Sequence, residues 1–181
     1  MEEPDPHVVA AARGGDMGAF ENLVRRYQGD VFRFSLHLVS DRNLAEDVTQ
    51  ETFIRAYRFL KRYRGDSRFS TWLFSIARNC VQDEFRKAGR RARLVKKIEG
   101  GTTAALPPEQ ISAPEVREAL AALPPELLEP VVMIDVFGFS YREVSEITAT
   151  SEGTIKSRVH RARERLVQLL GPQDQEDADE I

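Results

Sequence analysis

The residues from Gly65 to Arg91 combine aromatic rings and cations in one short stretch. The stretch holds the only tryptophan of the chain, Trp72, together with three phenylalanines, and six Arg or Lys side chains are interleaved with them. Aromatic faces stack on unpaired bases and cations hold the phosphate backbone, so this combination is typical of a surface that binds single-stranded nucleic acid. An amphipathic core helix with a solvated basic face would give the same pattern, and this stretch alone does not separate the two.

A second stretch, Phe139 to Leu170, has the layout of a helix-turn-helix. A short helix is expected from Ser140 to about Ile147, and Ser151 is a natural N-cap for the next helix. The apolar residues of that next helix recur at steps of three and four and predict its buried stripe: Ile155, Val159, Ala162, Leu166 and Leu169. The side chains expected to point outward are Lys156, Ser157, His160, Arg161 and Glu164. Between Gly153 and Leu170 there are five Lys or Arg against one acid, which favours a DNA-reading helix over an ordinary helical hairpin.

Together the two stretches resemble the sigma-70 family of RNA polymerase sigma factors, most closely its small extracytoplasmic-function (ECF) group. The resemblance rests on DVTQETF at 47–53, on FSTWLFSIARN at 69–79 and on the segment from LPPELL to RARERL at 123–166. It implies an adaptor that gives promoter specificity to a polymerase supplying the chemistry. The implied partners are promoter DNA, an anti-sigma factor, and the polymerase core through the clamp helices of its largest subunit and through its second-largest subunit.

The resemblance places the polymerase-docking face on a helix expected from about Asn43 to Lys61. Its residues fall away from the predicted buried face: Asp47, Gln50, Glu51 and Ile54. Most charge runs are solvated helix faces, but an apolar Ile54 among polar residues suits a protein contact better than bare solvent.

The resemblance assigns the melted −10 promoter element to the loop before the Trp72 helix and to that helix. The loop set, expected to capture a flipped base, is Gly65, Asp66, Ser67, Arg68 and Phe69, with Trp72 either stacking at the edge of the melted region or lying in the core. A base leaves the stack at a cost of a few kcal/mol, which a pocket formed by the Phe69 ring and the loop backbone would offset. Asn79 can hydrogen-bond a base edge, and the expected phosphate contacts are Arg78, Arg86, Lys87, Arg90 and Arg91.

The −35 element, as duplex, is assigned to the second helix of the helix-turn-helix. The positions that match base contacts are Lys156, Ser157, His160 and Arg161, and those expected to contact phosphates are Thr154, Arg158 and Arg163. The turn departs from the family, which usually has an apolar-Gly-apolar sequence where this chain has Thr148-Ala149-Thr150. An Ala149 in the left-handed conformation would cost about 1 kcal/mol.

The predicted fold is all-α, with two small helical domains. Residues 8–92 form the N-terminal domain, 93–113 a flexible linker, 114–170 the C-terminal helix-turn-helix domain and 171–181 an acidic disordered tail. One or two helices are expected from Val8 to Val39, and Ser70 is expected to cap the Trp72 helix.

Composition agrees with nucleic-acid binding once charge distribution is considered. The net charge is −3, but residues 52–97 hold 14 Lys and Arg against 3 Asp and Glu. No apolar run long enough to cross a bilayer and no signal peptide are visible, so a cytoplasmic location is expected, with an anti-sigma factor as the link to a membrane. The lone Cys80 is expected in the core, and neither a catalytic site, a metal site nor a cofactor is predicted.

Two rival functions remain from the sequence. A helix-turn-helix repressor or activator would bind duplex DNA alone, but would not need the aromatic helix or the docking face. A DNA-processing enzyme would need metal-binding acids, and the basic stretch contains only Asp66, Asp83 and Glu84. For control, a partner protein is expected to be the main off switch, and the acidic tail folding onto residues 86–97 a weaker one.

Overall fold

The computed structural model describes residues 1–96 and 114–171, without the side chains of residues 90–96. Every regular element in these residues is helical, which confirms the predicted all-α class. The predicted linker lies outside the described residues from residue 97 onward. The predicted disordered tail lies outside them as well, apart from Gly171.

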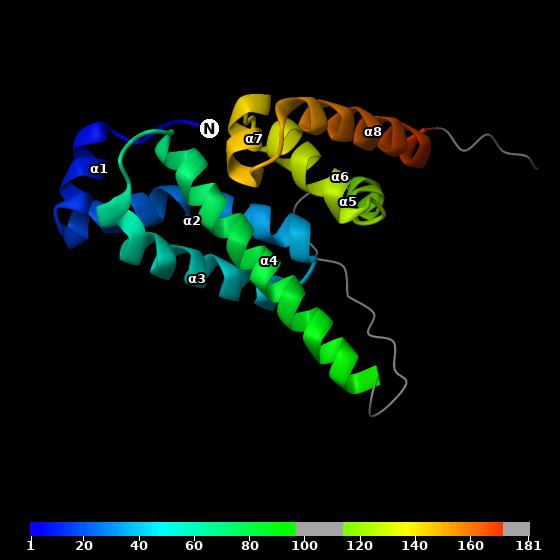
Figure 1. Cartoon of the computed structure of the whole chain (residues 1–181), viewed down its shortest axis with the longest axis horizontal. Helices are drawn as coiled ribbons and strands as arrows, with labels where there is room; N and C mark the ends of the chain where they lie inside the picture. The colour runs from blue at the N-terminus through cyan, green and yellow to red at the C-terminus, as the bar shows by residue number, and fades with distance from the viewer. Residues whose placement is uncertain (97–113, 172–181) are drawn as a thin grey trace, which may run out of the picture.

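The N-terminal unit consists of α1 (Pro6–Arg13), α2 (Met17–Val39), α3 (Arg42–Phe59), the short 3-10 helix η1 (Leu60–Arg62) and α4 (Phe69–Lys96) (Figure 1). Aspartates cap the first three helices: the carboxylates of Asp5, Asp16 and Asp41 each accept a backbone N–H at 2.8–3.0 Å. Part of the acidic character of this half is therefore used to start its helices.

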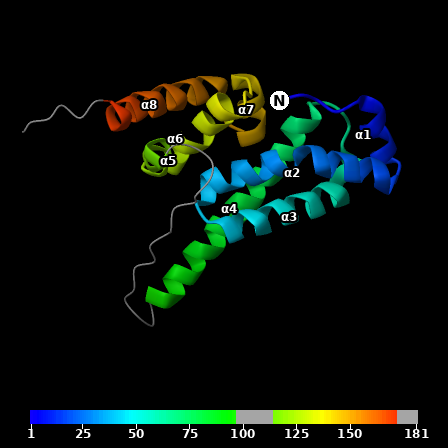
Figure 2. The same ribbon diagram turned by 180° about the vertical axis from the view of Figure 1, so that it is seen from behind.

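Helix α4 differs from the prediction at both ends. It begins at Phe69, so Ser70 lies inside its first turn and is not the cap. It continues to Lys96, four residues past the expected domain end at 92, and its second half projects beyond the other helices (Figure 2). Residues 90–96 are mostly Arg, Ala, Leu and Lys, which favour helix, although they lack the apolar periodicity that would have predicted one.

The C-terminal unit consists of α5 (Pro114–Ala121), α6 (Pro125–Val131), the π-helical turn η2 (Val132–Val136), α7 (Tyr141–Thr148) and α8 (Glu152–Leu170). Ser140 and Glu143 form a capping box at the start of α7, and Ser151 caps α8 as predicted. Ile155, Val159 and Ala162 are buried, but Leu169 is exposed, contrary to the predicted stripe, because the last turn of α8 lies beyond the core.

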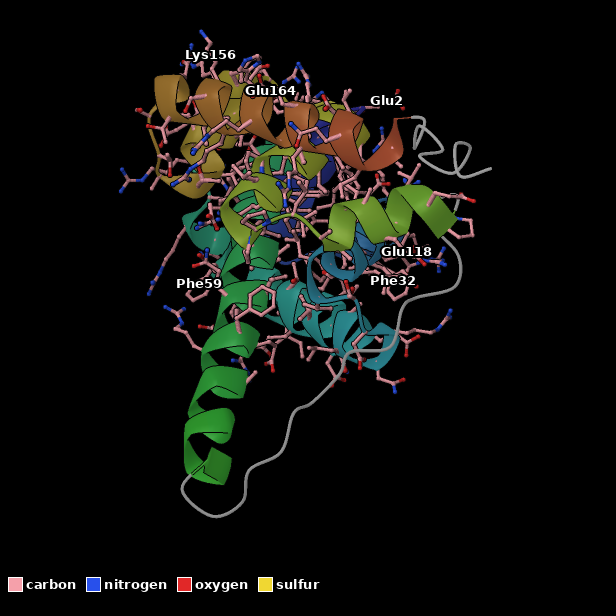
Figure 3. All side chains as sticks on the ribbon, turned by 90° about the vertical axis from the view of Figure 1, so that its right-hand side faces the viewer. Glu2, Phe32, Phe59, Glu118, Lys156 and Glu164 are labelled. Carbon is pink, nitrogen blue, oxygen red and sulfur yellow. The ribbon has the colours of Figure 1, made fainter. Side chains whose placement is uncertain are left out.

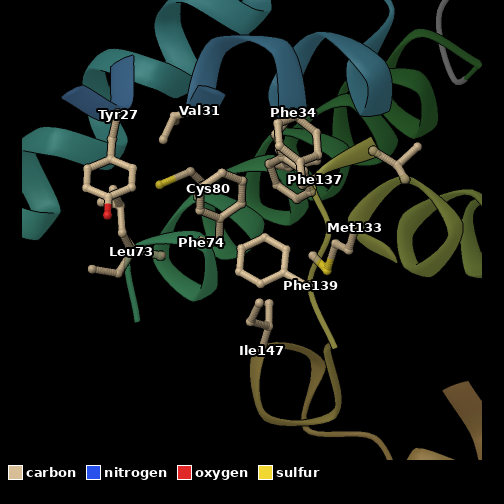
Figure 4. Packing of buried hydrophobic residues seen from close by; sticks show 14 of the residues in the cluster. Tyr27, Val31, Phe34, Leu73, Phe74, Cys80, Met133, Phe137, Phe139 and Ile147 are labelled. Atoms are coloured by element: carbon tan, nitrogen blue, oxygen red, sulfur yellow. The ribbon is translucent and has the colours of Figure 1, made fainter. Parts of the chain in front are cut away.

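The two units pack on each other through four aromatic side chains, here called the interdomain cluster: Phe34 of α2, Phe74 of α4, and Phe137 and Phe139 after η2 (Figure 4). All four are buried, and the ring centroids of Phe74 lie 5.5 Å from Phe137 and 5.0 Å from Phe139. Edge-on and tilted aromatic pairs at this spacing are favourable. The units thus share one apolar core in what we call the closed arrangement.

Candidate nucleic-acid interface

The loop between η1 and α4 is supported by a group of aromatic rings. Phe69 is only 3% exposed, and its ring centroid lies 5.6 Å from Tyr27, 5.8 Å from Tyr63 and 5.5 Å from Trp72. The Phe69 ring, which the sequence predicted to face a base, is therefore covered by other aromatic rings of the protein. Its role is to anchor the loop to the core. Trp72 is half-buried: part of its side chain packs against the core and part is exposed, so its stacking role stays a prediction.

Tyr63 also belongs to this site, although the sequence did not single it out. Its ring lies 5.1 Å from Trp72, and its hydroxyl donates a 2.7 Å hydrogen bond to the carbonyl of Ser67. Gly65 has a φ of 82°, in the left-handed region that favours glycine. Gly65, Asp66 and Arg68 are exposed at the tip of the loop, with Ser67 half-buried.

Two cations, one on α4 and one in the loop before it, pair with acids of the C-terminal unit. Arg78 forms a two-pronged ion pair with Glu129 of α6, at 2.6 and 3.3 Å, and Arg68 lies 3.2 Å from Glu143 of α7. Both contacts cross between the two units. The side chains of Arg78 and Glu129 are each only 17% exposed, so Arg78 is not available to DNA in the closed arrangement.

The remaining predicted −10 residues lie further along α4. Asn79 is exposed, and Arg86 is ion-paired with Asp83 and Lys87 with Glu84 on the same helix. Such exposed pairs contribute little and open easily. Arg90 and Arg91 lie in the helix, but their side chains are outside the description.

Two of the four predicted docking residues line a groove, and the other two lie outside it. Gln50 and Ile54 line an open groove of about 800 Å³ between α2 and α3, whose other walls include Phe20, Phe32 and Tyr57. Ile54 is 39% exposed. Asp47 is exposed outside the groove, and the half-buried Glu51 accepts a 2.6 Å hydrogen bond from Arg55.

Arg55 joins α3 to α4 through a second bond, 2.7 Å long, to Asp83. The Arg55 hydrogen bond is the main cause that lowers the pKa of Asp83. Burial is the main cause that raises the pKa of the nearby Cys80 thiol, which fits the predicted core role of this residue.

Helix α8 presents the predicted −35 side chains on its outer face. Lys156, Ser157, His160 and Arg161 are all exposed, and Figure 3 shows Lys156 at the outer surface of the molecule. The Lys156 ammonium lies 5.8 Å from the centroid of the Tyr141 ring of α7. Thr154 and Arg158 are half-buried beside them. Arg163 is different, because it forms a two-pronged ion pair with Asp135 of η2 at 2.6 and 3.1 Å and so helps to hold α8 on the unit.

The turn before α8 has the left-handed backbone conformation that the sequence analysis considered for Ala149. Ala149 has φ 51° and ψ 41°, in the left-handed region, and its N–H bonds the carbonyl of Ser145. The hydroxyl of Thr148 donates to the carbonyl of Val144 at 2.7 Å. This bond within α7 gives the buried hydroxyl a partner at a position where the family usually has an apolar residue.

In the described ranges, 1–96 and 114–171, no three His, Cys, Asp or Glu side chains converge in a way that could hold a metal ion. Within the same ranges, none of the helices has the length and apolar character needed to cross a bilayer.

Comparisons with known proteins match both units. The Sigma-70 region 2 family matches residues 23–91, and the Sigma-70 region 4 family matches residues 114–166. The RNA polymerase sigma-H factor of Pseudomonas aeruginosa is 34% identical, over 94% of this chain and 96% of that protein. The ECF RNA polymerase sigma-E factor of Haemophilus influenzae is 33% identical, over 93% and 96%.

Two solved structures are also similar. The sigma factor RpoE from Bartonella quintana, in complex with the anti-sigma factor NepR, has a TM-score of 0.73 and 31% identity over 85% of this chain and 98% of that one. CnrH in complex with the cytosolic domain of CnrY has a TM-score of 0.69 and 27% identity over 90% and 94%. A region 2 unit with a basic aromatic helix and a region 4 helix-turn-helix, in a chain that aligns with sigma factors over almost its full length, make this protein a member of the sigma-70 family, in its extracytoplasmic-function group.

Proposed function

We propose that this sigma factor docks on the core polymerase through the groove between α2 and α3, captures the melted −10 element at the start of α4 and reads the −35 element with α8. The observation that carries the proposal is the groove: Gln50 and Ile54 lie on an open, largely apolar surface of the same unit that carries the −10 helix. An open apolar surface of this kind is typical of a protein–protein contact, and a polymerase adaptor needs one.

The two DNA sites are of different kinds. On α4, the half-buried Trp72 and the loop beside it offer ring and backbone surface for unpaired bases, and the cations further along offer phosphate contacts. On α8, four exposed polar and basic side chains lie on the face opposite the buried stripe, as major-groove reading requires. Arg163 is better assigned to holding α8 in place than to a phosphate.

The closed arrangement and promoter binding compete for the same side chains. Arg68 and Arg78 cannot pair with Glu143 and Glu129 and contact DNA at once. We infer that the two units separate on the promoter and that an anti-sigma factor favours the inactive form of this protein; one of the similar structures, RpoE, is bound to an anti-sigma factor. The protein is not expected to be an enzyme, and it acts in the cytoplasm, where the polymerase is.

Substituting Ile54 with Asp tests the docking assignment. A carboxylate in the apolar groove must lose its solvent when a partner binds, so the Ile54→Asp variant should lose core polymerase binding and promoter-dependent transcription by about tenfold or more. The matched control is Val167→Asp, since Val167 is an apolar side chain of α8 that is 69% exposed and lies outside the groove.

Polymerase capture by the immobilised chain and run-off transcription measure both variants. Equal loss in the two variants would show that the groove is not the docking site. Tight, specific duplex binding by the isolated wild-type chain, with no gain from core polymerase, would favour the repressor instead.

A further inference from the structure

The segment from Met1 to Asp5 lies beside the first turn of α4, where the proposed −10 site begins. Hydrogen bonds to its backbone carbonyls fix it there. The Tyr27 hydroxyl donates to the carbonyl of Glu2 at 3.1 Å, and Arg26 donates to the carbonyls of Glu2 and Glu3, each at 3.3 Å. Pro4 is buried. Burial, followed by the charge of Glu3, raises the pKa of Tyr27 to about 12, so its hydroxyl remains a donor at physiological pH.

This segment delivers the Glu3 carboxylate to the first turn of α4. One oxygen of Glu3 accepts the backbone N–H of Phe69 at 2.9 Å, and the other accepts the hydroxyl of Ser70. The first N–H groups of a helix have no acceptor within the helix, and a negative charge is favourable beside them. A side chain 66 residues upstream therefore supplies the cap that Ser70 was expected to give.

The bonds from Glu3 lie at one end of the exposed loop Gly65–Arg68. The other end is fixed by Tyr63, whose hydroxyl bonds the carbonyl of Ser67 and whose ring contacts Phe69 and Trp72. Between the two anchors, the loop backbone is held against the aromatic rings without being buried itself. Loss of the Glu3 anchor would free the Phe69 N–H and the Ser70 hydroxyl and release the loop at its α4 end.

We propose that Glu3 is a positioning residue for capture of the unpaired −10 base: it holds the loop and the first turn of α4 in the geometry that receives the base. Extruding a base has a substantial cost, and a site offsets this cost only if its walls are already in place. This inference rests on the assignment of the −10 site in the proposed function.

The test measures how much the captured base contributes to binding. The probe is a single-stranded −10 non-template oligonucleotide, compared with the same oligonucleotide carrying an abasic site at the captured position, each bound to core polymerase loaded with the sigma factor. With the wild-type chain the abasic site should weaken binding about tenfold, as expected for loss of one stacked base. With Glu3→Ala the abasic site should weaken binding by less than about threefold, because the site is already disordered.

Two further variants separate positioning from charge. Glu3→Gln should stay close to wild type, since an amide oxygen can accept the Phe69 N–H and the amide NH2 can donate to the Ser70 hydroxyl. Glu2→Ala is the matched control, because it removes the same charge from the neighbouring residue and leaves the Glu2 carbonyl in place. It also removes the ion pair between the 91% exposed Glu2 side chain and Arg26, so it reports any effect of that pair on the segment.

The outcomes distinguish this inference from the proposed function. An unchanged abasic penalty in Glu3→Ala, or an equal reduction in Glu2→Ala, would overturn the role of Glu3 while leaving the −10 site intact. No abasic penalty in the wild-type complex would overturn both. If Glu3→Ala proves too unstable in thermal denaturation, Ser70→Ala decides, since it removes one of the two bonds and should give an intermediate penalty; a wild-type penalty there would contradict the proposal.

Discussion

At the scale of single residues, several side chains have a partner that decides their role. Arg161 and Arg163 are two positions apart on α8 and alike in sequence, yet one is exposed and the other is bound to Asp135. On α4, Arg78 is bound to a distant acid and Asn79, its neighbour, is exposed. Residue type predicts what a side chain can bind, and its neighbours decide whether it is free to do so.

Ala149 gives a prediction at this scale. Its left-handed φ of 51° is strained for a residue with a Cβ, and glycine adopts it without that strain. Ala149→Gly should raise the free energy of unfolding by about 0.5–1 kcal/mol, after allowing for the greater freedom of glycine in the unfolded chain. Thermal denaturation should show the midpoint rise by a few degrees.

The control for Ala149→Gly is the same change in an ordinary helical position. Ala88 is exposed within α4, and Ala88→Gly should destabilise by about 1 kcal/mol. If both substitutions destabilise the protein, the turn is not strained by Ala149.

At the scale of elements, α3 and α4 are joined by charge as well as by apolar packing. Arg55 of α3 donates both to Glu51 on its own helix and to Asp83 on α4, and Asp83 also accepts from Arg86. Asp83 and Glu84 are adjacent carboxylates, which on a helix point in different directions. Asp83 serves to hold α4, which carries the proposed −10 site, on α3, which carries the proposed docking residues.

Asp83→Asn should therefore lower stability in a pH-dependent way. The folded-state pKa of Asp83 lies below its ordinary value of 3.8, so the ionised carboxylate stabilises the fold above that pH, and the contribution is lost as the pH falls through the lower, folded-state pKa. The difference in unfolding free energy between wild type and variant should be largest near pH 7 and shrink toward pH 2–3. Chemical denaturation at a series of pH values measures it.

Glu84→Gln is the control for this prediction, because among the described side chains Glu84 pairs with Lys87 of its own helix, α4, and not across to α3. Its effect on stability at pH 7 should be smaller. A pH-independent effect of Asp83→Asn would mean that the carboxylate acts by shape rather than by charge.

At the scale of the whole molecule, the closed arrangement joins two units that are linked in sequence only by residues 97–113. The interdomain cluster supplies the apolar part of the contact, and the ion pairs Arg78–Glu129 and Arg68–Glu143 supply the polar part. Glu143 also caps α7; burial opposes its ionisation, but bonds from Ser140 and the charge of Arg68 outweigh burial and lower its pKa. In the closed arrangement, Glu129 and Glu143 therefore pair with two cations that are proposed to contact the promoter.

Glu129→Gln should shift the protein toward the open form. It removes the charge that neutralises Arg78 across a largely buried contact, so the Arg78 guanidinium loses its ionic partner. The distance between fluorophores on α1 and α8 should increase, and promoter-dependent transcription without an inhibitor should rise a few-fold.

Glu126→Gln provides the control, because Glu126 is an exposed acid on the same helix, α6. It should change neither distance nor transcription. Greater opening of Glu129→Gln without a gain in transcription would show that the closed arrangement does not limit promoter binding.

The sequence by itself determined the family, the all-α class and most helices, because these depend on local patterns: apolar periodicity, capping residues and the two family motifs. It also determined the exposed face of α8, since the opposite stripe, Ile155 to Ala162, can only be buried. Each cap, apolar stripe and motif is a pattern of residues close together in one stretch of the sequence.

Only the tertiary structure decided which site residues are available and what supports them. The packing of the Phe69 ring on Tyr27, the capping of α4 by Glu3, and the engagement of Arg78 and Arg163 by Glu129 and Asp135 all join residues that lie from about 28 to 67 positions apart. No local pattern encodes such pairs, because an acid and a base far apart in sequence meet only when the packing of several helices has fixed their positions.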